Sequence, residues 1–278
     1  MKRILVPTDF SPQAENALKV AAQLARKFDG EIFLLHMLEL PLQLVGTGSA
    51  VGGGSHDLPE ALFFMKLAKK RFTTILKAPY LKDIPVHETV EFHQAFEGIM
   101  EVSKKHNCDI IVMGSHGASG FKEMFIGSNT EKVVRNSQIP VLIIKNEHQV
   151  FNIDDFVFAT DCNLDNKHTL NQALRFAEQI GARIHLVYIN TANNFRTSEE
   201  AETCLKDFVK GEDFSQFTFN IYNDVTVENG ILNFARSINA GLIGISTHGR
   251  KGLAHFFNGS ISEDLVNHAQ QPVVTFKI

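Results

Sequence analysis

The sequence predicts an α/β fold of two doubly wound halves in tandem, each an open parallel sheet of five strands covered by helices. Short apolar runs rich in β-branched residues alternate with helical patterns along the chain, which is typical of such sheets. The strand candidates are almost continuously apolar, as expected of parallel strands with helices on both faces. The scheme occurs twice, because residues 116–145 align without gaps with residues 248–277.

The first half is expected to begin with a strand followed by an amphipathic helix. In that helix apolar side chains recur at 3.6-residue spacing, Ser11 is suited to the N-cap, Pro12 to the first position, and Asp29-Gly30 to the C-terminal end. The expected strands are residues 2–7, 31–37, 86–91, 108–113 and 141–145, and the expected helices are residues 11–28, 58–77, 94–107 and 129–137.

The second half repeats this order in fewer residues. Thr8 aligns with Thr160 but Gly127 aligns with Gly259, so about twenty residues are missing between these points, most simply opposite residues 40–56. The expected strands are residues 155–159, 183–188, 217–223, 241–245 and 273–277, and the expected helices are residues 167–180, 198–210 and 227–239.

The domains predicted from this duplication are residues 1–146 and residues 153–278. The chain of 278 residues is long enough for two domains that each bury a core. The connection from the last strand of the first domain to the first strand of the second, residues 146–154, is roughly nine residues long and spans at most about 30 Å when extended. We therefore expect the two domains to pack together as a pseudo-dimer within one chain.

Composition excludes several classes of protein. Charged residues make up 21% of the chain and hydrophobic residues 44%, as in ordinary globular proteins, and the net charge of −4 argues against a large nucleic-acid surface. The three cysteines form no CxxC pair, and the histidines form no metal-binding pattern, so neither a metal site nor a disulfide framework is expected. No signal peptide or membrane span is recognisable, which favours the cytoplasm.

Glycines recur in the segment that follows the fourth strand of the first half. Gly114, Gly117 and the pair Gly127-Ser128 lie between this strand and the next helix start. Free backbone N–H groups and the positive end of a helix dipole favour an anion there, and glycines let a ligand approach the main chain. The segment therefore predicts a backbone cradle for phosphates, although glycines in such turns also serve packing alone.

Three other candidates are expected at the same edge of the sheet. Thr8 and Asp9 follow the first strand, and Met37 ends the second, so they should meet Gly114 beyond the carboxyl ends of the strands, where such sheets bind ligands. Asp9 has an alternative role as the N-cap of the first helix. His36 is more simply a core histidine than a ligand.

On these residues the chain resembles the universal stress protein family in its tandem form, whose domains are Rossmann-like. The resemblance covers nearly the whole sequence. Nucleotide-binding members of the family carry glycine, two residues, glycine, nine residues, then glycine with serine or threonine, which Gly114, Gly117, Gly127 and Ser128 match. The opening VPTDFS and the closing IPVLIIK of the first half are also similar to the family.

The resemblance implies that ATP, together with Mg, binds to the first half. The base would contact Pro7, Thr8 and Met37, while Asp9 would hydrogen-bond the ribose or adenine, and the remaining residues would meet the ribose and phosphates. The implied binding residues are Pro7, Thr8, Asp9, Met37, Met113, Gly114, Gly117, Gly127, Ser128 and Asn129.

The second half departs from the motif at its first glycine, where Ser246 replaces the counterpart of Gly114. A Cβ there would hinder close backbone approach, and a positive φ would add strain. We therefore expect nucleotide mainly in the first half. The second half could instead bind a different small ligand beside Phe256 and Phe257.

No catalytic residue can be assigned, because the chain contains no Gly-Lys dipeptide and hence no P-loop lysine. The expectation is a nucleotide-dependent regulator or sensor of the stress response with slow or no hydrolysis. The alternative is a scaffold protein of the same fold that binds no nucleotide. Its protein partners, and any further homodimer, are not indicated by the sequence.

Overall fold

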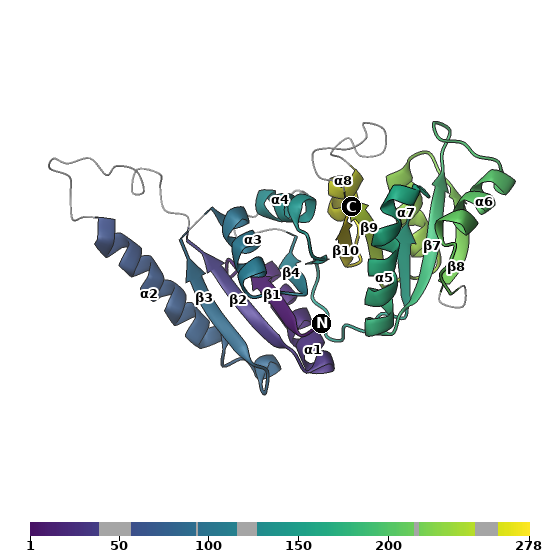
Figure 1. Cartoon of the computed structure of the whole chain (residues 1–278). Helices are drawn as coiled ribbons and strands as arrows, with labels where there is room; N and C mark the ends of the chain where they lie inside the picture. The colour runs from purple at the N-terminus through teal and green to yellow at the C-terminus, as the bar shows by residue number, and fades with distance from the viewer. Residues whose placement is uncertain (39–56, 93, 116–126, 214–216, 248–260) are drawn as a thin grey trace.

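The computed structural model describes residues 1–38, 57–92, 94–115, 127–213, 217–247 and 261–278. Its described strands form one sheet in the order β3-β2-β1-β4-β5-β10-β9-β6-β7-β8 (Figure 1). These strands are β1 Arg3–Pro7, β2 Glu31–Met37, β3 Val86–Glu91, β4 Ile110–Gly114, β5 Val141–Ile144, β6 Asp155–Ala159, β7 Arg183–Asn190, β8 Phe217–Asn223, β9 Leu242–Thr247 and β10 Val273–Lys277.

Helices cover both faces of this sheet. The described α-helices are α1 Pro12–Phe28, α2 Asp57–Ile75, α3 Ala95–Lys105, α4 Ser128–Asn136, α5 Lys167–Ile180, α6 Ser198–Phe208, α7 Val227–Ser237 and α8 Ile261–His268, with short 3₁₀ helices at η2 Pro79–Leu81 and η3 Leu164–Asn166. Apart from these 3₁₀ turns and α8, each element was expected from the sequence, within a few residues at its ends.

Each half is a parallel sheet with the same strand order, β3-β2-β1-β4-β5 and β8-β7-β6-β9-β10. The halves join through their last strands, β5 and β10, which pair antiparallel with Val274 opposite Leu142. This pairing places the halves about an approximate two-fold axis, with α4 and α8 near the junction (Figure 1). The prediction of tandem α/β halves packed as a pseudo-dimer is confirmed.

The core is also shared between the halves. Residues of β1 alternate between two apolar clusters, Ile4 and Val6 in one and Leu5 in the other. The cluster of Ile4 contains side chains of α1 and α5, and the cluster of Leu5 contains side chains of α3, α4, α7 and α8. Because each cluster takes residues from both halves, burial of apolar surface stabilises the chain as one unit.

Local signals explain how α1 begins and ends. The Oγ of Ser11 accepts a hydrogen bond from the N–H of Ala14 at 3.2 Å, and Pro12 follows, as expected. At the other end Asp29, rather than Gly30, has the left-handed conformation, with φ 49°. Gly30 is needed for a different reason, since a Cβ there would lie 2.7 Å from the carbonyl oxygen of Lys2.

The halves differ most in the connection that follows their second strand. Residues 38–56 link β2 to α2, whereas residues 191–197 link β7 to α6. The connection is thus twelve residues shorter in the second half, as the sequence alignment expects, but α6 with 11 residues is also shorter than α2 with 19, so the helix shares in the loss. No helix among the described residues is both long and apolar enough to cross a membrane.

Candidate functional site

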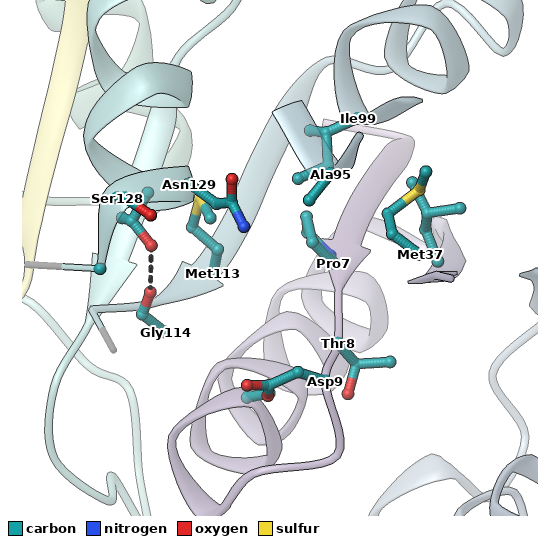
Figure 2. A pocket seen from close by; sticks show the side chains of 14 residues that line it. Pro7, Thr8, Asp9, Met37, Ala95, Ile99, Met113, Gly114, Ser128 and Asn129 are labelled. Carbon is teal, nitrogen blue, oxygen red and sulfur yellow. Dashed lines mark hydrogen bonds between the residues drawn. The ribbon is translucent and has the colours of Figure 1, made fainter. Parts of the chain in front are cut away.

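A cavity of about 360 Å³ lies at the carboxyl ends of the strands in the first half (Figure 2). Its walls come from the ends of β1, β2 and β4 and from the starts of α1, α3 and α4. The lining residues are Pro7, Thr8, Asp9, Ala14, Leu35, Met37, Ala95, Ile99, Met113, Gly114, Gly127, Ser128, Asn129 and Thr130. Every site residue expected from the sequence lines this cavity except Gly117, which lies outside the described residues.

The turn after β1 shapes one side of the cavity. The Thr8 hydroxyl accepts a hydrogen bond from the N–H of Phe10, and the Asp9 carboxylate accepts one from the N–H of Ser11, each at 3.0 Å. Phe10 has a positive φ of 65°. Because Ser11 caps α1, the alternative interpretation of Asp9 as the N-cap is wrong. Asp9 instead stabilises the turn that leads into the helix.

The start of α4 forms the opposite side. Gly127 occupies the N-cap position with φ −62° and, having no side chain, offers no capping oxygen. The Gly127 N–H donates to Ser115 O at 2.8 Å, and the Thr130 hydroxyl donates to Gly114 O at 3.1 Å, so the helix start is tied to the end of β4. The first amides of a helix have no acceptor within the helix. Those of α4 therefore give the cavity donors and the positive end of a helix dipole.

The remaining wall is apolar. Leu35 and Met37 come from β2, and Ala95 and Ile99 lie one turn apart at the start of α3 (Figure 2). Ala95 and Ile99 were missed as site residues at the sequence level. Their four-residue spacing places them on one face of a helix, but periodicity alone does not distinguish a cavity wall from the core.

Gly114 is explained by packing of α1 against β4. A Cβ at this position would lie 2.9 Å from the carbonyl carbon of Gln13. Gly114 is not among the described glycines with a positive φ, so backbone strain is not the reason for a glycine here. The glycine lets the start of α1 approach the end of β4, which brings the β1 turn and the α4 start to the same cavity.

His36 has a structural role, as the interpretation of a core histidine expects. Its Nδ1 lies 2.8 Å from the carbonyl oxygen of Thr8, and its ring packs on Phe10 at a centroid distance of 4.4 Å. Burial lowers the pKa of His36, and the hydrogen bond to Thr8 opposes that effect. The histidine therefore supports the β1 turn from beneath and is not part of the cavity lining.

The second half preserves the first turn but changes the surroundings. Asp161 accepts from the N–H of Asn163 at 3.0 Å, as Asp9 does from Ser11. At the position matching Gly114, the Ser246 hydroxyl lies 2.7 Å from the hydroxyl of Thr169 on α5. The 3₁₀ turn η3 precedes α5, so this helix begins later than α1 and the Ser246 side chain is accommodated. Residues 248–260, with Phe256 and Phe257, lie outside the described residues.

A metal site is not evident in the part of the chain that the structure describes. Within that part, no three side chains of His, Cys, Asp or Glu lie close enough together to hold a metal ion.

Comparison with known proteins agrees with this architecture. The family model described as "Universal stress protein family" matches residues 1–145 and 221–277. A universal stress protein of Methanocaldococcus jannaschii is 32% identical over 53% of this chain and 96% of its own length. One from Synechocystis is 21% identical over the full length of both chains.

Among solved structures, a universal stress protein from Archaeoglobus fulgidus has a similar fold. Its TM-score is 0.72 at 23% sequence identity, covering 99% of this chain and 96% of that chain. This match supports the fold of both halves together, while the sequence matches identify the family. The chain belongs to the universal stress protein family, in a form with two tandem halves.

Proposed function

We propose that the cavity of the first half binds ATP with Mg, and that the protein acts as a nucleotide-dependent regulator in the stress response. In this proposal residues 1–146 are the nucleotide-binding domain and residues 153–278 are its degenerate partner. The observation that carries it is the start of α4, where a helix capped only by Gly127 faces a cavity that also has an apolar wall.

The lining suggests one orientation of the nucleotide. The adenine would lie against Met37, Ala95 and Ile99, because this is the apolar part of the cavity. Thr8 and Asp9 would meet the ribose edge. The phosphates would lie at the end of β4 and the start of α4, where Ser128 and Asn129 supply backbone N–H donors, and the loop containing Gly117 would complete the cradle. Mg²⁺ would enter on the phosphates, as it commonly does.

The same lining argues against fast hydrolysis. Among the described residues of the cavity there is no lysine, arginine or histidine to neutralise charge on a γ-phosphate. The carboxylate of Asp9 already accepts a hydrogen bond from Ser11. Binding energy that is equal in ground and transition states tightens the complex without accelerating the reaction. A binding and signalling role follows more readily than an enzymatic one.

Calorimetry with Mg-ATP, and mass spectrometry of nucleotide released by denaturing the purified protein, test this proposal. We expect one equivalent of ATP per chain. Replacing Ala95 by Trp should fill the apolar wall and abolish binding, whereas Val227→Trp, at the corresponding position of the second half, should leave the affinity unchanged. Circular dichroism of both variants would verify that they fold.

Three outcomes would contradict the proposal. Absence of binding would favour the scaffold interpretation, and full affinity in the Ala95→Trp variant would exclude this cavity. Phosphate release on the order of 1 per second or faster would make the protein an enzyme.

A further inference from the structure

Two cysteines that are distant in the sequence meet in the second half. Cys162 follows β6 in the turn before η3, and Cys204 lies in the middle of α6. The thiol of Cys162 lies next to that of Cys204. Cys162 is buried, with 7% of its surface exposed, whereas Cys204 is only partly buried. One thiol of the pair is thus accessible to a small solute and the other is held behind it.

An arginine contacts the more accessible thiol. Nη1 of Arg196 donates to Sγ of Cys204, and the guanidinium lies 5.1 Å from the ring centroid of Tyr188. Tyr188 is fully buried, and its hydroxyl donates to Asn194 O at 3.0 Å, so it forms a rigid surface beneath the arginine. A positive charge next to a cysteine favours the thiolate, which is the reactive form.

The backbone of Arg196 is fixed as well. Its N–H donates to Asn190 Oδ1 at 2.9 Å, and its carbonyl accepts from Asn190 Nδ2 at 3.2 Å. The next residue, Thr197, begins α6 with a capping box that includes Glu200. Arg196 and Cys204 are therefore positioned by the same helix start, which makes their contact a built feature rather than a chance approach of two long side chains.

The first half has a different arrangement at the same place. Phe10 and Cys162 both follow a Thr-Asp pair, have φ of 65° and 61°, and donate their N–H to the preceding threonine hydroxyl at 3.0 Å. Phe10 packs on Phe72 of α2 at 5.3 Å between ring centroids, whereas Cys162 contacts Cys204 of α6. A noncovalent aromatic contact between the first turn and the following helix is replaced by two thiols.

We propose that Cys162 and Cys204 form a reversible disulfide when the protein meets a hydroperoxide, with Arg196 activating Cys204 as the attacking thiolate. The Cys204 thiolate attacks one peroxide oxygen, the O–O bond breaks, and Cys204 becomes a sulfenic acid as hydroxide leaves and takes up a proton. The Cys162 sulfur then attacks that of Cys204 and loses its proton. The S–O bond breaks and a second water departs, so two thiols and one hydrogen peroxide give one disulfide and two waters.

Burial supports this assignment of roles. It raises the pKa of the Cys162 thiol, and the neighbouring Cys204 raises it further, so Cys162 forms a thiolate less readily than an exposed cysteine and is not the thiol that attacks the peroxide. Disulfides in reducing compartments are usually transient and redox-sensing. The bond would tie the turn that carries Asp161 to α6, and its formation does not depend on nucleotide binding.

The test uses the full-length protein, reduced and then treated with hydrogen peroxide. Free thiols titrated after denaturation should fall from three to one, and dithiothreitol should restore all three. The intact mass should decrease by two hydrogen atoms, and a peptide containing Cys162 should be linked to one containing Cys204. The variant Cys108→Ser, which removes the buried thiol of the first half, should form the same bond.

Variants separate the two roles. Cys162→Ser should leave a Cys204 sulfenic acid that reacts with dimedone, and Cys204→Ser should abolish the fast oxidation. Arg196→Met should slow oxidation about tenfold, because the positive charge beside the attacking sulfur is lost, whereas Arg196→Lys should retain most of the rate. An unchanged thiol count, a disulfide between chains, or an Arg196→Met variant that oxidises at the normal rate would overturn the proposal.

Discussion

At the scale of single residues, Gly114 has the most consequential environment in the first half. It ends β4 where α1 begins, and the nearest atoms to a Cβ there belong to the Gln13 backbone, which cannot rotate away as a side-chain end can. The absence of a side chain at Gly114 lets the start of α1 pack close to the end of β4, and the cavity lies between these two elements. A glycine in a sequence motif can thus be required by the packing behind a ligand site, whether or not a ligand touches it.

The first prediction concerns this packing. Gly114→Ala should lower the free energy of unfolding by about 1–3 kcal/mol, because the backbone of α1 must move to admit the methyl group. Urea unfolding followed by circular dichroism would measure the loss. Gly241→Ala is a matched control, since its Cβ would meet the flexible end of the Ile153 side chain at 3.1 Å. Equal destabilisation by the two substitutions would contradict the explanation.

At the scale of elements, the ends of α1 and α4 play different roles at one cavity. The start of α1 is capped by the Ser11 side chain, whereas α4 begins at Gly127 without a side-chain cap. A side-chain cap accepts hydrogen bonds from the first backbone N–H groups of a helix. Where no such cap is present, these N–H groups bond to water or to an anion. The contrast distinguishes a structural helix start from one that is available to a ligand.

A charge introduced at the start of α4 tests this distinction. Gly127 has φ −62° and ψ 140°, which any residue can adopt, so Gly127→Asp should cap the helix and keep or slightly increase stability. Its carboxylate would occupy the phosphate position and should weaken ATP binding at least about tenfold in calorimetry. Gly127→Asn, a neutral cap of the same shape, should weaken binding much less. Equal losses in both variants would point to steric hindrance instead.

At the scale of the whole molecule, two lysines cross between the halves in a symmetric manner. Nζ of Lys145, which follows β5, donates to the carbonyl oxygen of Asn267 near the end of α8 at 2.5 Å. Nζ of Lys277, at the end of β10, donates to the carbonyl oxygen of Arg135 on α4 at the same distance of 2.5 Å. Each half thus caps the last helix of the other with a cation, where the helix dipole favours one.

These lysines make stability depend on pH at the alkaline side. Burial lowers the pKa of Lys145 from 10.5 to about 8 and also lowers that of Lys277. Between these two values the folded chain has lost a proton from Lys145 that the unfolded chain still holds, so this residue should make stability rise with pH across that window. In urea unfolding from pH 8 to 10, Lys145→Met should lack that contribution. Lys132→Met, an exposed lysine on α4, should keep the wild-type pH dependence, and an unaltered profile in Lys145→Met would refute the assignment.

The amino-acid sequence could predict the strands, most helices and the edge where the cavity lies. Periodicity and chain order carry this information locally, and the carboxyl ends of parallel strands necessarily meet at one edge. Hence Thr8, Met37 and Gly114, which are distant in sequence, could be placed together. The apolar wall of Ala95 and Ile99 could not be distinguished from the core, because both follow the same helical spacing.

By itself, then, the sequence determined the duplicated α/β architecture, the family and the Ser11 cap of α1. Only the tertiary structure decided that Gly114 faces Gln13, that Lys145 reaches across to the other half, and that Cys162 meets Cys204. These are contacts between segments far apart along the chain, and no local pattern records them. They depend on how β5 pairs with β10 and how each helix packs on the sheet, which are properties of the assembled fold.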